Sequence, residues 1–313
     1  MHNSIVVVGS INMDLVIRSP RLPQLGETLL GGDFHTFPGG KGANQAVACA
    51  RLGAKVKMIG KVGMDSFGDE LLRGLAANGV DINAIEAVPE TSTGVALITV
   101  VASGDNAIVV SPAANGQITS TDILKYEKLI QGTSVLVLQL EIPLEAVETA
   151  IDLARKNGVI VVLNPAPAQP LPEPLLSKVD YIIPNQSELA ALTGEQDIKA
   201  GIYHLRSRYA GNLMITLGEQ GVIFTDNNKI FHLSSYPVQA VDTTAAGDAF
   251  VGAFAVGISE GKTLPDAIRM GNAAGALAVQ KAGAQPSLPT RAELEKFMQA
   301  QHEPRLTFLS EIN

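Results

Sequence analysis

The stretch Asp242-Thr243-Thr244-Ala245-Ala246-Gly247-Asp248-Ala249-Phe250 is the most informative part of this chain. It places two carboxylates six residues apart around a run of small residues, and an apolar stretch from Phe250 to Ile258 follows it. This pattern predicts a loop that leads into the first turn of a helix. Backbone amides in such a turn are free, and together with the helix dipole they favour a bound anion.

The residues at this predicted helix start suit phosphoryl transfer to an alcohol. Ala245, Ala246 and Gly247 have no side chains large enough to keep a phosphate away from the free amides. Asp248 is expected in the same positive field, which favours its ionised, proton-accepting form. An anion site beside a carboxylate base is what transfer of a phosphoryl group to a hydroxyl requires.

The composition limits the kind of protein that the chain can form. Its 313 residues permit one large α/β domain or two smaller ones, and 46% hydrophobic with 17% charged residues predicts a globular fold. A net charge of −8 argues against a nucleic-acid partner. The single cysteine, Cys49, lies in an alanine-rich helical pattern and is expected to be a small buried residue.

Several other sites and locations are disfavoured. The five histidines and the one cysteine do not show the His-x-x-x-His or Cys-x-x-Cys spacing that is typical of transition-metal sites, which argues against such a site. Neither a Gly-x-Ser-x-Gly elbow nor a Gly-x-Gly-x-x-Gly segment after the first strand is present. No apolar run approaches the roughly 18 residues of a membrane helix, and the first residues do not resemble a secretory signal. We therefore expect a cytoplasmic protein without a membrane partner.

Short β-branched runs alternate with amphipathic patterns, which predicts an α/β fold with a mostly parallel central sheet and helices on both faces. Buried strands are predicted at Ser4–Val8, Lys55–Ile59, Val135–Gln139, Val159–Leu163, Tyr181–Pro184 and Leu213–Leu217. Helices are predicted at Ala43–Leu52, Gly68–Asn78, Pro143–Asn157 and Ala267–Lys281. We expect a single domain over residues 1–303 and a C-terminal tail over residues 304–313.

Two segments, at about residues 12–37 and 91–110, break this alternation. Leu15–Thr36 has little helical pattern and several Pro and Gly residues. The second segment predicts strands at Gly94–Val101 and Ala107–Val110 around the hairpin turn Ser103-Gly104-Asp105-Asn106. Together the two segments are expected to form a small antiparallel sheet that projects from the main body. Such a sheet can cover a site or pair with a second subunit through its edge.

The run Pro38-Gly39-Gly40-Lys41-Gly42-Ala43-Asn44-Gln45-Ala46 is the second informative segment. Its glycines let the backbone approach a ligand closely, just before a helix. Lys41 and Asn44 offer donors that can hold hydroxyl groups. A glycine turn that only caps the helix explains the run equally well, and the pattern is not that of a P-loop.

Polar residues also follow the predicted strands, at the edge where ligands bind in open α/β sheets. Asn12 and Asp14 project the same way in an extended segment, and an amide beside a carboxylate suits a vicinal diol. Glu141 closes the apolar run Val135–Leu140. On spacing alone, an Asx turn explains Asn12 and Asp14 as well, and a solvated loop carboxylate explains Glu141.

Two further segments have both a structural and a functional interpretation. Asn185 and Glu188 show the pattern of a helix capping box. In the functional interpretation, they form a polar pair that lies near phosphates or metal-bound water. Thr216-Leu217-Gly218-Glu219-Gln220-Gly221 predicts a hairpin turn before Val222–Thr225, although it also suits the floor of a nucleotide site.

These runs together resemble the ribokinase family of carbohydrate kinases, also called the PfkB family. Its two signatures are matched at Gly39–Ala46 and Asp242–Phe250, and Asn185-x-x-Glu188 matches a third element. The resemblance covers the chain to about Gln301 in the expected order. It is strongest to the ribose-specific members, in Gly9-Ser10-Ile11-Asn12-Met13-Asp14, Gly39–Ala46, Asn164-Pro165-Ala166-Pro167-Ala168 and Gly283-Ala284-Gln285-Pro286-Ser287.

The resemblance implies a ribokinase-like fold with a β-sheet lid and ATP-dependent phosphorylation of D-ribose at its 5-hydroxyl. By this resemblance, Asp248 would act as the base. The 245–248 loop, which contains Ala245, Ala246 and Gly247, would form the anion hole. The resemblance assigns the sugar to Asn12, Asp14, Gly40, Lys41, Asn44, Glu141 and Asp248. It assigns ATP to Asn185, Glu188, Thr216, Gly218, Gly221, Gly247 and Asn272, with Mg²⁺ held from Glu188 through water.

The resemblance also implies an activating potassium ion and a homodimer formed through the lid. The positions that match the family's K⁺ site, several through backbone carbonyls, are Asp242, Thr244, Ala278, Lys281, Gly283 and Ser287. Two alternatives stay open at this point. One is a kinase for another sugar or a nucleoside; the other is a catalytically silent sugar-binding protein, which would have no need of Asp248.

Overall fold

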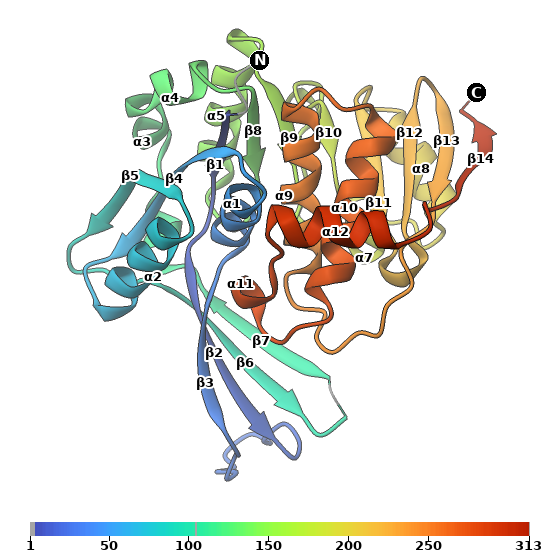
Figure 1. Ribbon diagram of the computed structural model, residues 1–313. Coiled ribbons are helices and arrows are strands. Elements are labelled where there is room, and N and C mark those ends of the chain that lie inside the picture. The colour runs from blue at the N-terminus through green and yellow to red at the C-terminus, as the bar shows by residue number, and fades with distance from the viewer. Residues whose placement is uncertain (1–3, 104, 313) are drawn as a thin grey trace.

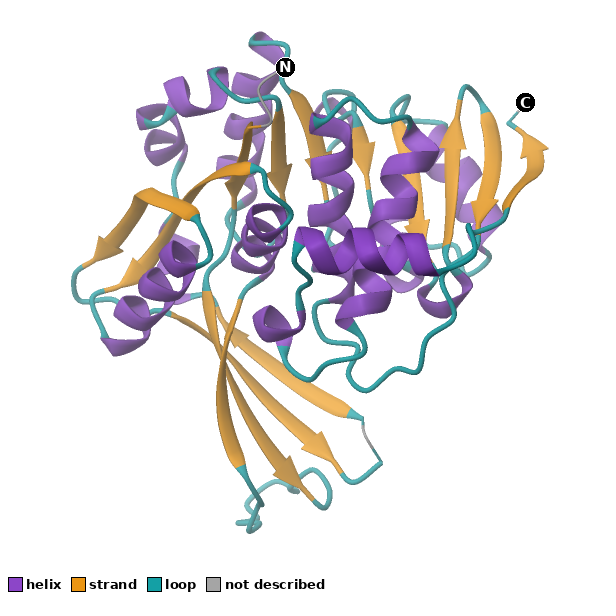
Figure 2. Ribbon diagram, viewed as in Figure 1, coloured by secondary structure: helices purple, strands orange, loops and turns teal. Residues whose placement is uncertain are grey.

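The structure is a computed structural model that describes residues 4–103 and 105–312 (Figure 1). Gly104 of the predicted hairpin turn, residues 1–3 of the predicted domain and Asn313 of the predicted tail lie outside the described residues. Within the described residues, helices flank a large sheet, and a smaller sheet projects from one end of it (Figure 2). The predicted α/β class with a mostly parallel sheet is therefore confirmed.

The large sheet has the strand order β14-β13-β12-β11-β10-β9-β8-β1-β4-β5. Its strands are β1 (Ser4–Val8), β4 (Lys55–Gly63), β5 (Val80–Val88), β8 (Val135–Leu138), β9 (Ile160–Leu163), β10 (Tyr181–Ile182), β11 (Asn212–Thr216), β12 (Val222–Asp226), β13 (Lys229–Leu233) and β14 (Leu306–Glu311). Pairing is parallel from β5 to β11 and antiparallel from β11 to β14. The carboxyl ends of the parallel strands therefore meet at one edge, where the predicted polar residues follow them.

Two hydrophobic cores lie on opposite faces of this sheet because strand side chains alternate. In β1, Ile5 and Val7 belong to one core, and Val6 and Val8 to the other. The first core is covered by α1 (Lys41–Arg51), α2 (Ser66–Ala77), α9 (Ala246–Ser259), α10 (Leu264–Ala278) and α12 (Arg291–Ala300). The second is covered by α3 (Ser120–Lys125), α4 (Glu127–Gln131), α5 (Leu144–Lys156), α6 (Glu173–Leu176), α7 (Gln186–Thr193) and α8 (Ile198–Arg206). Helices on both faces agree with the sequence prediction.

The projecting sheet, called the lid sheet below, has the strand order β3-β2-β6-β7. Its strands are β2 (Asn12–Ser19), β3 (Phe34–Gly39), β6 (Gly94–Val101) and β7 (Asn106–Ser111). The two irregular sequence segments do form one small sheet, but the prediction that it is antiparallel throughout is wrong. β2 and β6 pair in parallel, because each leaves the main body at its own amino end and both run outward side by side (Figure 1).

The segment expected as a C-terminal tail contains β14, which pairs antiparallel with β13 at the edge of the large sheet. Phe308 packs edge-on against Phe231, with 5.8 Å between ring centroids. Leu306 and Phe308 lie two residues apart and therefore project to the same face of this edge strand. No helix of the described residues is long and apolar enough to cross a membrane.

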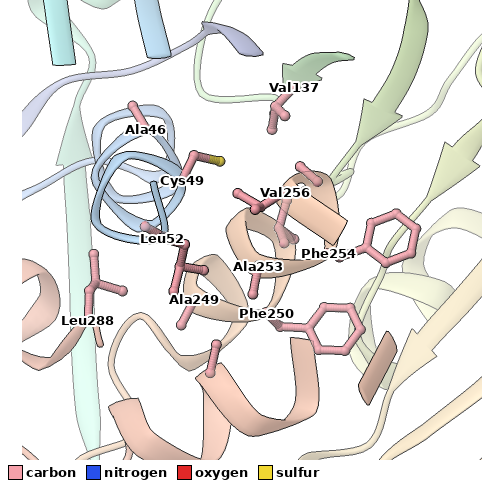
Figure 3. Packing of buried hydrophobic residues seen from close by; sticks show 14 of the residues in the cluster. Ala46, Cys49, Leu52, Val137, Ala249, Phe250, Ala253, Phe254, Val256 and Leu288 are labelled. Atoms are coloured by element: carbon pink, nitrogen blue, oxygen red, sulfur yellow. The ribbon is translucent and has the colours of Figure 1, made fainter. Parts of the chain in front are cut away.

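The close packing of α1 against α9 positions the site (Figure 3). Figure 3 shows Cys49 and Leu52 on the side of α1 that faces α9, with Val256, Ala253 and Ala249 of α9 opposite them. Cys49 is fully buried, as predicted, and its thiol donates to the carbonyl of Gly252 at 3.4 Å. Small side chains at this contact let the two backbones approach closely.

Gly252 offers a test of this contact. A methyl group at Gly252 would meet Ala48 Cβ at 2.5 Å. We expect Gly252→Ala to lower the free energy of unfolding by about 1–3 kcal/mol, because the helices must separate. The matched control is Gly74→Ala in α2, where a methyl group meets nothing within 4 Å. That control should raise stability by about 0.5–1 kcal/mol. Urea denaturation measures both, and equal effects would contradict the tight α1–α9 contact.

Candidate active site

The amino end of α9 is open to a ligand. Ala245 has a left-handed backbone (φ 58°), and no side chain caps the helix. At Gly247, a methyl group would meet nothing within 4 Å, and Ala246 and Gly247 line a cleft of about 770 Å³. The Ala246 amide donates to the Thr243 carbonyl at 3.3 Å, and the further amides of this uncapped first turn, beside the cleft, have the geometry of an anion site.

Asp248 joins the two informative sequence segments. Its Oδ2 accepts a hydrogen bond from Asn44 Nδ2 at 2.9 Å, and its Oδ1 accepts one from Gln45 Nε2 at 2.9 Å. The glycine-rich segment and the acidic helix start are therefore in direct contact. Burial raises the pKa of Asp248, and Glu141 adds to that effect. Lys41 and the two amides lower the pKa, so that they favour the carboxylate.

Lys41 lies among four carboxylates. Burial alone would lower the pKa of its ammonium, but Asp248, Glu141, Glu188 and Asp14 together raise it above the ordinary value. These carboxylates come from α9, the end of β8, α7 and β2. The structure thus gathers acidic residues from distant parts of the sequence around one cation.

The start of the lid sheet forms another side of this cluster. Asn12 is buried, and its Oδ1 accepts from Asn115 Nδ2 at 2.7 Å. The Asp14 carboxyl lies against Gly39, where a methyl group would meet it within 2.4 Å. Gly40 has a left-handed backbone (φ 86°), and a methyl group there would meet the Asn12 amide nitrogen at 2.7 Å. Both glycines therefore permit approaches that other residues would block.

Glu141 is held in place rather than solvated. Its Oε2 accepts from the Ser10 hydroxyl and, at 3.1 Å, from the Lys41 backbone amide. The Gly42 amide donates in turn to Ser10 Oγ at 3.3 Å. Ser10 and Glu141 thereby connect the ends of β1 and β8 to the start of α1, and the alternative of a free loop carboxylate is excluded.

Most of the predicted nucleotide residues line the 770 Å³ cleft. Among its lining residues are Thr216, Gly218, Gly221, Gly247 and Asn272. The segment 216–221 is also the predicted turn: residues Gly218–Gln220 form the short 3₁₀ helix η2 between antiparallel β11 and β12. Its structural and functional interpretations are therefore compatible.

Asn185 and Glu188 form the predicted capping box at the start of α7. Asn185 Oδ1 accepts from the Glu188 amide at 2.8 Å, and the Asn185 amide donates to Glu188 Oε2 at 2.8 Å. Asn185 also lines a second cleft, of about 440 Å³, which shares Thr216 and Gly218 with the first. Burial raises the pKa of Glu188. The pair thus has a structural role, and Asn185 also borders the second cleft, which adjoins the large one.

Two of the positions predicted for a potassium ion, Thr244 and Gly283, hydrogen-bond to a third, Asp242. Its Oδ1 accepts from the backbone and hydroxyl of Thr244, and its Oδ2 accepts from the Gly283 amide at 2.8 Å. The Ser287 hydroxyl donates to the Ala284 carbonyl. The Lys281 ammonium pairs with Glu293 at 2.9 Å, and its amide donates to the Ala278 carbonyl at 3.2 Å. From Ala278, Lys281 and Gly283, the groups suited to a cation are the backbone carbonyls, beside the Asp242 carboxylate.

The donor set fits a potassium ion better than a transition metal. Oxygen ligands from one carboxylate and several carbonyls suit a hard cation. No cluster of three His, Cys, Asp or Glu side chains with metal-binding geometry occurs in residues 4–103 and 105–312. A magnesium ion at Glu188 would therefore depend on water and phosphate oxygens for its remaining ligands.

Sequence reasoning missed the buried amides behind Asp248. Gln45, Gln139, Asn164 and Asn115 are all at most 9% exposed and hydrogen-bonded to one another or to site residues. A glutamine at the end of an apolar run, such as Gln139, was the available signal, because an unpaired buried amide is unfavourable and implies a partner.

The family model described as pfkB family carbohydrate kinase matches residues 2–291 of this chain. The "Ribokinase" of Bacillus subtilis is 44% identical over 295 residues, covering 94% of this chain and 99% of that protein. A "Deoxyribokinase" of Salmonella typhimurium is 37% identical, covering 94% of this chain and 98% of that protein. The Arabidopsis thaliana ribokinase solved with ribose and ATP superposes with a TM-score of 0.87 at 32% identity, covering 96% of this chain and 99% of the other.

Asp14 gives a prediction about pH and stability. Burial, followed by Glu141 and Asp248, raises the pKa of Asp14 from 3.8 to about 7. The folded state therefore holds this proton more tightly than the unfolded state, and stability falls as pH rises from about 4 through 7. We expect Asp14→Asn to raise the free energy of unfolding at pH 8 by about 2–4 kcal/mol and to have little effect near pH 4. Urea denaturation at both pH values measures this.

Glu293→Gln serves as a control of opposite sign. The Thr290 amide, Lys281 and the Thr290 hydroxyl lower the pKa of Glu293 to about 2. The ionised carboxylate thus stabilises the fold above its ordinary pKa, and this contribution is lost as pH falls through about 2. The variant should be less stable at pH 8. A destabilised Asp14→Asn protein at pH 8 would contradict the proposed electrostatic penalty.

Proposed function

This chain belongs to the pfkB family of carbohydrate kinases, and from that premise we propose that it phosphorylates D-ribose at the 5-hydroxyl with ATP. The supporting relatives are ribokinases that cover nearly its whole length. The observation that carries the proposal is the contact of Asp248 with Asn44 and Gln45, beside the open amino end of α9. It brings a carboxylate base, a polar pocket and an anion site into one place.

The polar residues around Lys41 fit a sugar. Asn44 donates to Asp248 through Nδ2, while its buried Oδ1 has no partner among the described residues. A sugar hydroxyl would satisfy this acceptor, since a buried polar atom without a partner is unfavourable. Asp14 and Glu141 can accept from further hydroxyls, and Lys41 can donate to them. Asn12 and the backbone of Gly40 complete the proposed sugar site.

Asp248 is proposed as the base. A carboxylate is a weak base for an alcohol, so it orients the 5-hydroxyl and takes its proton late, as the bond to phosphorus forms. The amides of the 245–248 loop stabilise the charge on the moving phosphoryl group, which is usually the larger effect. The lid sheet would exclude water and so prevent hydrolysis of ATP.

The 770 Å³ cleft is proposed for ATP. Its size is within the range of nucleotide and cofactor sites, and Gly247 lies at its border with the proposed anion hole. Thr216, Gly218, Gly221 and Asn272 would contact the nucleotide, with Asn185 on the phosphate side. Glu188 would hold Mg²⁺ through water; when bound, that ion neutralises charge on the phosphates.

The lid sheet is proposed as the homodimer contact. The strand register puts Ile17, Phe34, Leu97 and Val109 on one face of it, and all four side chains are exposed. A contiguous apolar face of this kind is typical of an interface. Sedimentation velocity tests the proposal, and a monomer at micromolar concentration would contradict it. The cytoplasmic location stays a prediction.

Phosphorylation of 2-deoxyribose is the second candidate, because a deoxyribokinase is 37% identical over nearly the whole chain. The two sugars differ only in the 2-hydroxyl. A site built to bond that hydroxyl strongly rejects the sugar that lacks it. Phosphate-transfer assays with ribose, deoxyribose, fructose and adenosine decide between them; equal efficiency on deoxyribose or fructose would remove the claim of ribose preference.

Asp248→Asn tests the catalytic proposal. We expect ribose binding to stay nearly intact and turnover to fall by at least ~10³-fold, because the amide cannot accept the proton. Calorimetry measures binding, and a coupled ADP assay measures turnover. The control is Asp152→Asn, an exposed carboxylate on α5 that pairs only with Lys178 among the described ion pairs. Turnover near that of the wild type in the Asp248 variant would remove Asp248 from the mechanism.

Potassium dependence tests the Asp242 loop. This loop is proposed to hold K⁺ through Asp242 and nearby carbonyls, and so to fix the amides at the start of α9. Replacing KCl by NaCl should lower both the rate and the melting temperature of the wild type. In Asp242→Asn, the melting temperature should no longer distinguish the two salts. A wild-type protein indifferent to the exchange would contradict the proposal.

A further inference from the structure

Asp248 contacts Gln45, a fully buried residue that does not face the proposed sugar site. Gln45 Nε2 donates to Asp248 Oδ1 at 2.9 Å, and Asn44 Nδ2 donates to Oδ2 at 2.9 Å. Each oxygen of the carboxylate therefore receives one amide N–H. Gln45 is 0% exposed, so no water competes for this bond.

A chain of buried amides holds Gln45. Gln139 Nε2 donates to Gln45 Oε1 at 2.6 Å. Gln45 Nε2 also donates to Asn164 Oδ1 at 3.2 Å, and Asn164 Nδ2 donates to the Ile183 carbonyl at 2.9 Å. Both N–H donors of the Gln45 carboxamide and one lone pair of its Oε1 are thereby used, and full burial of the side chain keeps the remaining lone pair from a sugar hydroxyl.

One backbone carbonyl sets the direction of every bond in this chain. The Ile183 oxygen can only accept, so Asn164 must turn its NH₂ group toward it and its Oδ1 toward Gln45. Gln45 must then present its NH₂ group to both Asn164 and Asp248. A rotated Gln45 would place its carbonyl oxygen against the Asp248 carboxylate and its nitrogen against Gln139 Nε2. Gln45 is therefore a donor to Asp248 and cannot be an acceptor.

The charged groups that interact with Asp248 have opposing effects on its ionisation, so that a hydrogen-bond donor can affect the balance. Lys41 of α1 favours the carboxylate, whereas Glu141, after β8, opposes it. Asp14 of β2 and Glu188 of α7 also interact with Asp248. Burial is the largest of these effects and favours the protonated acid, so that hydrogen bonds to the ionised form are needed against it.

We propose that Gln45 is a positioning residue that keeps the Asp248 carboxylate ionised and aligned with the acceptor hydroxyl, with Asn164 and Gln139 fixing its orientation. This inference rests on the proposed function, in which Asp248 is the base. Gln45 does not touch the substrate; it acts through the carboxylate alone. Its effect should therefore appear in turnover and pH dependence rather than in sugar affinity.

The test uses Gln45→Met, which keeps the side-chain volume and removes the donor. We expect kcat for ribose to fall about 10-fold to 100-fold, because a misplaced reacting group loses up to about 10²-fold. The acid limb of the kcat profile should move to higher pH by about one unit or more, since the ionised form loses a donor. The ribose dissociation constant from calorimetry should change less than about threefold, because no Gln45 atom is free for the sugar.

Gln139→Met provides a second variant, since it removes only the donor to Gln45 Oε1. It should shift the profile in the same direction by a smaller amount, and it keeps the proposal testable if Gln45→Met does not fold. Gln131→Met is the matched control on the exposed helix α4, where the side chain bonds only Glu127 among the described contacts. Its kcat and pH profile should match the wild type.

A readout without catalysis separates this inference from the proposed function. Titration of the Asp248 carboxyl by ¹³C NMR, in the protein without ligands, should show a higher pKa in Gln45→Met than in the wild type. If the wild-type protein does not phosphorylate ribose, the proposed function is wrong. The titration would still show whether Gln45 affects the ionisation of Asp248. A folded Gln45→Met protein with wild-type titration and pH profile would overturn the inference, even if its melting temperature were lower.

Discussion

The contact between the amino ends of α1 and α9 is the constraint on which the site depends. Asn44 and Asp248 are 204 positions apart in sequence and 2.9 Å apart in space. Small residues along both helices permit this approach, because larger side chains would separate the backbones at Gly252. The proposed catalytic arrangement therefore depends on core packing, because the hydrophobic contact and the polar contact both lie between α1 and α9.

The parallel sheet supplies the remaining polar groups at the same place. Ser10 follows β1, Glu141 follows β8 and Asn164 follows β9. Neighbouring parallel strands end at one edge, so residues that follow different strands become neighbours without any local signal between them. Hydrogen bonds from Ser10 and Lys41 to Glu141 then connect this edge to α1. The order and direction of the strands thus bring these residues together, and hydrogen bonds between the residues fix their side chains.

The charges of the site oppose the stability of the empty protein. Asp14, Glu141, Glu188 and Asp248 surround a single Lys41, and burial raises the pKa of three of these acids. Each of these carboxylates can accept more hydrogen bonds than the protein provides to it. A ligand rich in hydroxyl groups would supply further donors, so that hydrogen bonds to these buried carboxylates would contribute to affinity and specificity.

Sequence alone predicted the features that local patterns encode. Buried strands such as Ser4–Val8 and the helix after Gly40 were placed within a few residues, since apolar period and glycine position are local signals. The parallel pairing of β2 with β6 was missed because strand pairing between distant segments leaves no local mark. Gln45 and Gln139 were missed because a glutamine in sequence does not reveal whether it is buried, and only the packed structure shows what orients it.

The lid sheet and the proposed sugar site share the same backbone segments. β2 begins at Asn12, two residues after Ser10, and β3 ends at Gly39, immediately before Gly40. Asn12 pairs with Gly39 at the base of the sheet, and Gly40 packs so closely on the Asn12 amide that it has no room for a side chain. A rotation of the lid sheet about this base must carry Asp14 with it. Closure over a ligand and alignment of the groups that bind it are therefore the same motion, so that a sugar which contacts Asp14 also determines the position of the lid.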